Sequence, residues 1–181
     1  MRRLMAALTS SVAGKLTVPA DVTALGPALC EAMAERRGRP VLLKVVAIPP
    51  EIGVTGMWLA KQDADLVVVE ENTEPGHKLV ILGHELWHME AGHCGHHLPG
   101  AAVAARALPG AEAGWAEAFT AVAARTHFED GHESEAEEFG LLLGSRFRTW
   151  LPGHRTPASR TEVEGRIEAS LSYRRGGMQG G

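Results

Sequence analysis

The chain has 181 residues, of which 45% are hydrophobic and 22% are charged. This balance excludes an extensively disordered protein and is enough for one domain with its own core. The net charge is −4 with neutral histidines, which excludes a global basic field that attracts nucleic acid. Two cysteines, Cys30 and Cys94, do not make a disulfide framework in a chain of this length and are typical of a reducing cytoplasm.

The first residues share some features with a secretory leader. Arg2 and Arg3 precede a short apolar stretch, residues 4–8, but Thr9 and two serines interrupt it. The apolar stretch is shorter than the hydrophobic region of a usual leader. No stretch approaches the length of a membrane-spanning helix. We therefore expect a cytoplasmic protein.

The next part of the chain is expected to contain one helix followed by strands. Asp21 is a candidate N-cap for a helix that ends near Arg37, with Gly38 as its stop signal. Apolar runs rich in β-branched residues predict three strands, at residues 41–48, 54–60 and 66–70. Residues 62–65 are expected to form a hairpin turn between the second and third strands.

The rest of the chain is expected to be mostly helical. One helix is predicted from about residue 75 to 91, with Thr73 as a capping residue and Gly92 as its end. Another is predicted from residue 131 or 132 to residue 150. Shorter helical pieces are expected in residues 101–124 and 161–170. Early strands and late helices indicate an α+β fold, with a main domain at 1–152 and a short C-terminal helix and tail at 153–181.

The sequence HELWH, at residues 84–88, carries the clearest chemical pattern. His84 and His88 are four residues apart, so on a helix they project from one face and can bind one metal ion. Glu85 lies on a neighbouring face, from which its carboxylate can act as general base on a water molecule at the metal. Zinc (Zn2+) suits the site because it accepts nitrogen and oxygen ligands. We therefore predict a catalytic zinc site.

The neighbours of the two histidines support this interpretation. Val80, Trp87 and Ala91 fall on the same side of the predicted helix as His84, so the histidines are expected on its inward, apolar face. Polar side chains buried there need partners or a metal, because unsatisfied burial is costly.

The third ligand is expected from the last long helix. In the metzincin pattern a third histidine stands ten residues after the first, but that position is Cys94. A His₂Glu site takes a glutamate from a later helix instead. The glutamates available there are Glu133, Glu135, Glu137 and Glu138, and the apolar stripe is Ala136, Gly140, Leu143, Phe147 and Trp150. Helical phase narrowly favours Glu133 as the ligand, with Glu137 in reserve.

Residues from about Val41 to Trp150 resemble the ImmA/IrrE family of metallopeptidases. The resemblance rests on Gly56 with the strands around it, on HELWH, and on the late helix. On that helix Glu133 takes the family's ligand position, while Ala136, Phe139 and Gly140 take its small, aromatic and second small positions. Trp87 stands where the family often has glycine.

The resemblance implies a gluzincin-like fold, in which a small twisted sheet packs on the active-site helix and the next major helix supplies the ligand glutamate. It implies a zinc-dependent endopeptidase whose substrate is a separate helix-turn-helix transcriptional repressor. An extended substrate segment is expected to add to a sheet edge at residues 54–60 or 66–70.

Other interpretations remain open from the sequence. The main rival is a non-proteolytic effector of a toxin–antitoxin-like pair with a structural metal, although a structural site has no use for Glu85. A metal-dependent hydrolase of a non-peptide amide is a third. A second metal site is an alternative to a polar loop at His93, Cys94, His96 and His97. One of these histidines, or His127 or His132, is a candidate for stabilising the reaction intermediate, for which Tyr173 is poorly placed.

Overall fold

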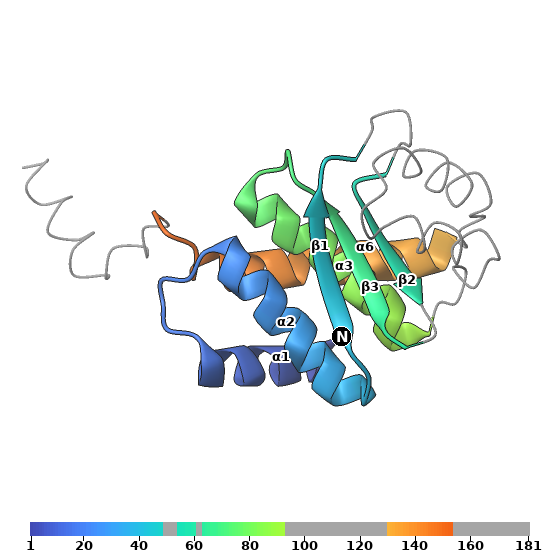
Figure 1. The fold of residues 1–181 in the computed structure, drawn as a ribbon, viewed down its shortest axis with the longest axis horizontal. Coiled ribbons are helices and arrows are strands. Elements are labelled where there is room, and N and C mark those ends of the chain that lie inside the picture. Colours follow the sequence, from blue (N-terminus) through green and yellow to red (C-terminus); the bar gives the residue numbers. More distant parts are fainter. Residues whose placement is uncertain (49–53, 61–62, 93–129, 154–181) are drawn as a thin grey trace, which may run out of the picture.

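A computed structural model of the chain describes residues 1–48, 54–60, 63–92 and 130–153. Within these ranges the fold is α+β, as predicted, with four helices and one mixed sheet of three strands (Figure 1). The elements are α1 (Arg2–Lys15), α2 (Val22–Arg37), β1 (Val41–Val46), β2 (Gly56–Ala60), β3 (Asp65–Glu70), α3 (Pro75–Ala91) and α6 (Asp130–Arg148). The helical pieces predicted at 101–124 and 161–170 lie outside the described residues, as does most of the proposed tail.

β3 is the central strand of the sheet. It pairs parallel with β1, where Val41 lies opposite Asp65, and antiparallel with β2, where Gly56 lies opposite Val69. The predicted hairpin of β2 and β3 is thus confirmed. Asp65, however, was expected in the turn and is instead the first residue of β3, with a completely buried side chain. The carboxylate is stable there because arginine and tryptophan side chains surround it, as described below.

The leader-like residues at the start of the chain form α1. Its buried side chains, Leu4, Leu8 and Val12, follow a spacing of four residues and join the main core. The polar residues that interrupt the apolar run do not end the helix, because packing of one apolar stripe on α2 stabilises it. Lys15 adds an ion pair to Glu35 on α2 at 2.8 Å.

Local signals set the ends of α2 and α3. The Asp21 carboxylate accepts a hydrogen bond from the Ala24 backbone N–H at 2.9 Å, and Gly38 and Gly92 end the two helices with φ of 69°. These predictions are confirmed. The predicted cap Thr73 is wrong, because Pro75 is the first helical residue of α3 and Glu74 therefore takes the N-cap position.

α6 lies along α3 at very short range. A Cβ atom on Gly140 would be 2.6 Å from the Val80 carbonyl oxygen, and one on Gly83 would be 3.0 Å from the Gly140 Cα. The backbones approach this closely only because both positions are glycine. On the same side of α6, the predicted stripe residues Ala136, Leu143 and Phe147 are buried.

α3 ends at Ala91, as predicted, whereas α6 ends before the predicted residue 150. Ala91, the last residue of α3, was expected on the inward face but is exposed. α6 ends at Arg148, and Trp150 follows it in a turn with its ring 5.4 Å from that of Phe147. In the described part of the chain no helix is both long and apolar enough to cross a membrane.

Candidate metal centre

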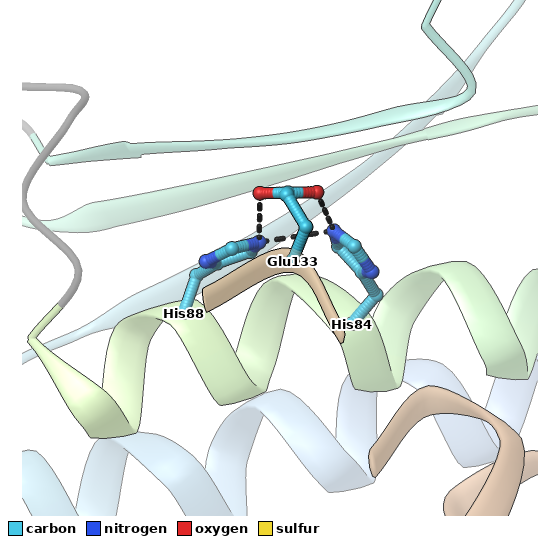
Figure 2. Close-up of side chains that lie close together, drawn as sticks. All are labelled: His84, His88 and Glu133. Atoms are coloured by element: carbon cyan, nitrogen blue, oxygen red, sulfur yellow. Dashed lines mark hydrogen bonds and ion pairs between the residues drawn. The ribbon is translucent and has the colours of Figure 1, made fainter. Parts of the chain in front are cut away.

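Three side chains from two helices converge on one point. His84 and His88 lie one turn apart on α3, and Glu133 reaches them from the first turn of α6 (Figure 2). The two Nε2 atoms are 3.0 Å apart. Glu133 Oε2 lies 3.4 Å from His84 Nε2, and Glu133 Oε1 lies 3.2 Å from His88 Nε2. The three side chains therefore lie close enough to bind one metal ion.

The surroundings of this ligand group favour a cation. His88 is only 2% exposed, and burial lowers the pKa of His84, against a smaller opposing effect of the Glu137 charge. Neutral imidazoles are the form that binds metals. Glu133 Oε1 is buried and accepts no hydrogen bond, and burial raises the pKa of that carboxyl. Because a buried oxygen that accepts no hydrogen bond is costly, a metal ion fits the group well.

Glu85 lies beside the ligand group, between α3 and β2. Its side chain is 6% exposed. Burial, and then repulsion from Glu133, raise the pKa of Glu85 to about 8, while a hydrogen bond from the Trp58 backbone N–H opposes them. A Cβ atom on Gly56 would lie 3.2 Å from Glu85 Oε1. Glycine at this position of β2 therefore leaves the space that the carboxylate occupies.

Two neutral imidazoles and one carboxylate are the donor set of catalytic zinc sites that keep one position open. Comparison of the chain with protein families, with curated proteins and with solved structures found no match. The interpretation of this group as a metal site therefore rests on its donor atoms and on their surroundings.

The other glutamates of α6 lie apart from the ligand group. Glu135 accepts a hydrogen bond from Trp87 Nε1 at 3.2 Å, and the Trp87 ring stacks on Phe139 at 5.3 Å. Trp87 thereby ties α3 to the turn of α6 that follows Glu133. Glu137, the reserve ligand, is exposed, and so is Glu138.

Most of the predicted accessory residues lie outside the described part of the chain. These are His93, Cys94, His96, His97, His127 and Tyr173. His132 is exposed next to Glu133, and its charge lowers the pKa of that carboxyl, less than burial raises it.

Sequence reasoning missed the role of Trp58. Nothing local in the sequence indicates that its backbone N–H faces Glu85, because the two residues meet only when β2 packs on α3. The strand assignment at 54–60 was the one available signal.

Proposed function

We propose that the chain is a zinc-dependent endopeptidase of the ImmA/IrrE type with a gluzincin-like arrangement of its sheet and two site helices. His84, His88 and Glu133 would hold Zn2+, and Glu85 would be the general base. One observation carries the proposal: a buried carboxylate, Glu85, lies beside a His₂Glu ligand group. A purely structural metal site does not require a second buried carboxylate, and burying one is costly.

The roles of the residues follow from their surroundings. When bound, zinc lowers the pKa of a water molecule and polarises the carbonyl of the scissile peptide bond. Glu85 accepts the proton of the attacking water and returns it to the leaving amine. Burial raises the pKa of Glu85 in the metal-free protein, and the positive charge of zinc would favour the charged carboxylate, which is the form that accepts the proton.

The side of β2 that no described strand pairs with is the proposed place for an extended substrate. Of the two strands considered from the sequence, residues 66–70 belong to β3, which is paired on both sides. β2 pairs with β3 alone among the described strands, and it contacts the active-site helix α3. A peptide added to β2 would therefore run past Glu85 and the ligand group.

A separate helix-turn-helix repressor is the proposed substrate. The net charge of −4 disfavours direct promoter binding by this chain. The resemblance to the ImmA/IrrE family supports limited cleavage of a regulatory partner over general digestion.

Mixing the purified protein, zinc and the repressor encoded beside it tests the function. We expect one discrete cut, which a chelator blocks and which Glu85→Gln abolishes, because an amide does not accept the proton of the water. Glu138→Gln is the matched control, because Glu138 is exposed on α6. The variant Glu85→Gln is expected to retain zinc by elemental analysis.

Other results would support the competing interpretations. Free digestion of casein with an intact repressor would replace the repressor hypothesis by a broad protease. Tight binding without cleavage of either protein would favour the non-proteolytic effector. Equal cleavage by Glu85→Gln and the unaltered protein would show that Glu85 is not the base.

A further inference from the structure

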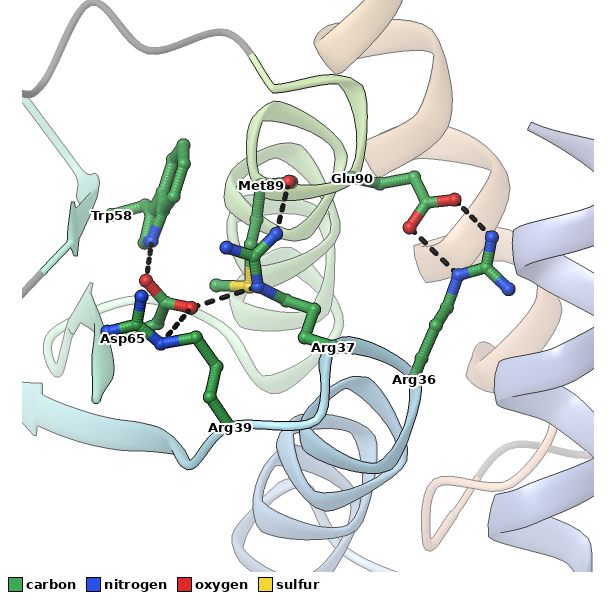
Figure 3. Close-up of polar contacts among 7 residues, drawn as sticks. All are labelled: Arg36, Arg37, Arg39, Trp58, Asp65, Met89 and Glu90. Carbon is green, nitrogen blue, oxygen red and sulfur yellow. Dashed lines mark hydrogen bonds and ion pairs between the residues drawn. The ribbon is translucent and has the colours of Figure 1, made fainter. Parts of the chain in front are cut away.

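A buried carboxylate outside the ligand group joins four elements of the fold (Figure 3). Asp65, at the start of β3, is 0% exposed. Its Oδ1 accepts a hydrogen bond from Trp58 Nε1 on β2 at 3.1 Å, and its Oδ2 accepts one from Arg37 Nε on α2 at 2.9 Å. Arg39 Nε, in the segment before β1, lies 3.4 Å from the same oxygen. We call these four residues the Asp65 cluster.

Arg37 extends the cluster to the active-site helix. Its Nη1 donates a hydrogen bond to the Met89 carbonyl oxygen of α3 at 2.8 Å. Its guanidinium also lies over the Trp58 ring, 5.7 Å from the ring centre. Trp58 is therefore held through its indole N–H by Asp65 and across its ring by Arg37, while Arg37 is itself fixed to the last turns of α3. A charged network around a buried carboxylate is rigid when every member has a partner.

The backbone of Trp58 faces the other way, toward the proposed base. The Glu70 backbone N–H donates to the Thr55 carbonyl, so these two residues form a hydrogen-bonded pair of the antiparallel ladder. Such pairs alternate along a ladder, which makes the pair of Trp58 and Val67 a non-hydrogen-bonded one. The Trp58 N–H consequently points away from β3, and it donates to the Glu85 carboxylate.

We propose that Trp58 and Asp65 are positioning residues for Glu85. The other members of the Asp65 cluster hold the Trp58 ring in place, and the ring holds the β2 backbone at this residue. The backbone N–H of Trp58 in turn holds the Glu85 carboxylate beside the metal ligands. The catalytic consequence rests on the proposed function, whereas the positioning of the Trp58 N–H does not.

Amide hydrogen exchange of the full-length protein tests the positioning without a substrate. In Trp58→Phe the ring remains apolar but the indole N–H is lost. We expect the backbone amide at position 58 to exchange about tenfold faster or more, the scale of a lost hydrogen bond to a charged acceptor. The amides of Met57 and Leu59, which bond to β3, serve as internal references, so an overall loss of stability cancels. Glu85→Ala sets the rate expected when the acceptor is absent.

A matched variant controls for the loss of an indole N–H. Trp150→Phe changes a tryptophan at the end of α6, where its ring contacts Phe147, and should leave the exchange ratio unchanged. Asp65→Asn should raise the ratio as Trp58→Phe does, because it removes the charge that holds Arg37. An unchanged ratio in both Trp58→Phe and Asp65→Asn would overturn the proposal, as would an equal rise in Trp150→Phe.

The catalytic part has its own readout. With the zinc-loaded protein and a cleaved repressor, Trp58→Phe should lower kcat about tenfold with KM and zinc affinity unchanged, because only the base is displaced. A higher KM with the same kcat would assign Trp58 to substrate binding and overturn its positioning role in catalysis. If no protein is cut but the exchange ratio rises, the proposed function fails while the positioning of Glu85 stands.

Discussion

Burial separates carboxylates that look alike in the sequence of α6. Glu133 has a buried oxygen 3.2 Å from His88 Nε2, whereas Glu138, five residues later, is exposed. The Glu135 carboxylate accepts a hydrogen bond from the Trp87 indole N–H. Among these glutamates of α6, Glu133 is therefore the candidate ligand, because a metal ion would offset the desolvation of its carboxylate.

The first prediction ranks these carboxylates. Glu133→Ala should weaken zinc binding by about a hundredfold or more, beyond the range typical of a residue that only supports a ligand. Glu135→Ala, Glu137→Ala and Glu138→Ala should change it little. Competition with a zinc chelator across the four variants gives the order. If Glu135→Ala proved the most damaging, the ligand assigned to α6 would be wrong.

At Gly56, a single added Cβ atom is expected to change the stability of the protein. An added Cβ would overlap Ile81 Cγ2 and press on Glu85. We expect Gly56→Ala to lower the free energy of unfolding by about 1–3 kcal/mol, the usual cost of overpacking, measured by urea denaturation. Gly14→Ala in α1 is the control: no atom of the described residues lies within 4 Å of its added Cβ, so stability should hold or rise slightly. Equal losses in the two variants would contradict the steric argument.

At the scale of elements, the site depends on how closely α3 and α6 approach. The two histidines belong to one helix and the glutamate to the other, so the distance between the helices sets the size of the ligand group. Gly140 and Gly83 meet at the crossing, and Gly144 extends the contact toward Val80. Trp87 adds a stacked ring and a hydrogen bond on the side of the metal ligands.

Gly140→Ala should therefore damage both the fold and the site. The added Cβ would meet the Val80 carbonyl and the His84 backbone nitrogen, which belong to the α3 backbone and yield only if the helices separate. We expect a lower free energy of unfolding, by about 1–3 kcal/mol, and weaker zinc binding. Gly131→Ala on the same helix should retain both, because no atom in the described part of the chain lies within 4 Å of its added Cβ. Unaltered zinc affinity in Gly140→Ala would show that the crossing does not set the ligand distances.

At the scale of the whole molecule, a metal would couple segments far apart in the chain. The proposed ligands come from residues 84, 88 and 133, so zinc bound to the folded state alone stabilises the complete fold. At a zinc concentration of 100 Kd the gain in unfolding free energy should be about 2.7 kcal/mol. Urea denaturation with and without zinc measures it, and His88→Ala should show no gain. A wild-type protein that folds without metal and gains nothing from zinc would contradict the metal site.

Cys30 reports on the same global transition from inside the core. Burial raises the pKa of its thiol from 9.0 to about 12. The folded state therefore holds the proton more tightly than the unfolded state, and the stability from this group is lost as pH rises from about 9 toward 12. In a Cys94→Ser background, a thiol reagent at pH 8 should label Cys30 only through unfolding, and zinc should slow the labelling. Fast labelling that is independent of zinc and urea would show that Cys30 is accessible in the folded protein.

Features that depend on neighbours along the chain follow from the amino-acid sequence alone. Asp21, Gly38 and Gly92 mark helix ends through their own backbone and side-chain preferences. The four-residue spacing in HELWH places His84 and His88 on one face of any helix. Helical phase on α6 favoured Glu133, the glutamate that does reach them.

Features that join distant segments depend on how the elements pack in three dimensions. Aspartate is common in turns, but arginines from α2 and from the segment before β1 stabilise Asp65 as the first residue of β3. The Trp58 N–H meets Glu85 because β2 packs on α3. Glu133 is half-buried whereas Glu137 is exposed, because glycines let α6 approach α3 closely. The spacing of apolar residues predicts which side chains share one face of an element. The burial and charge pairing of those side chains depend on which other element covers that face.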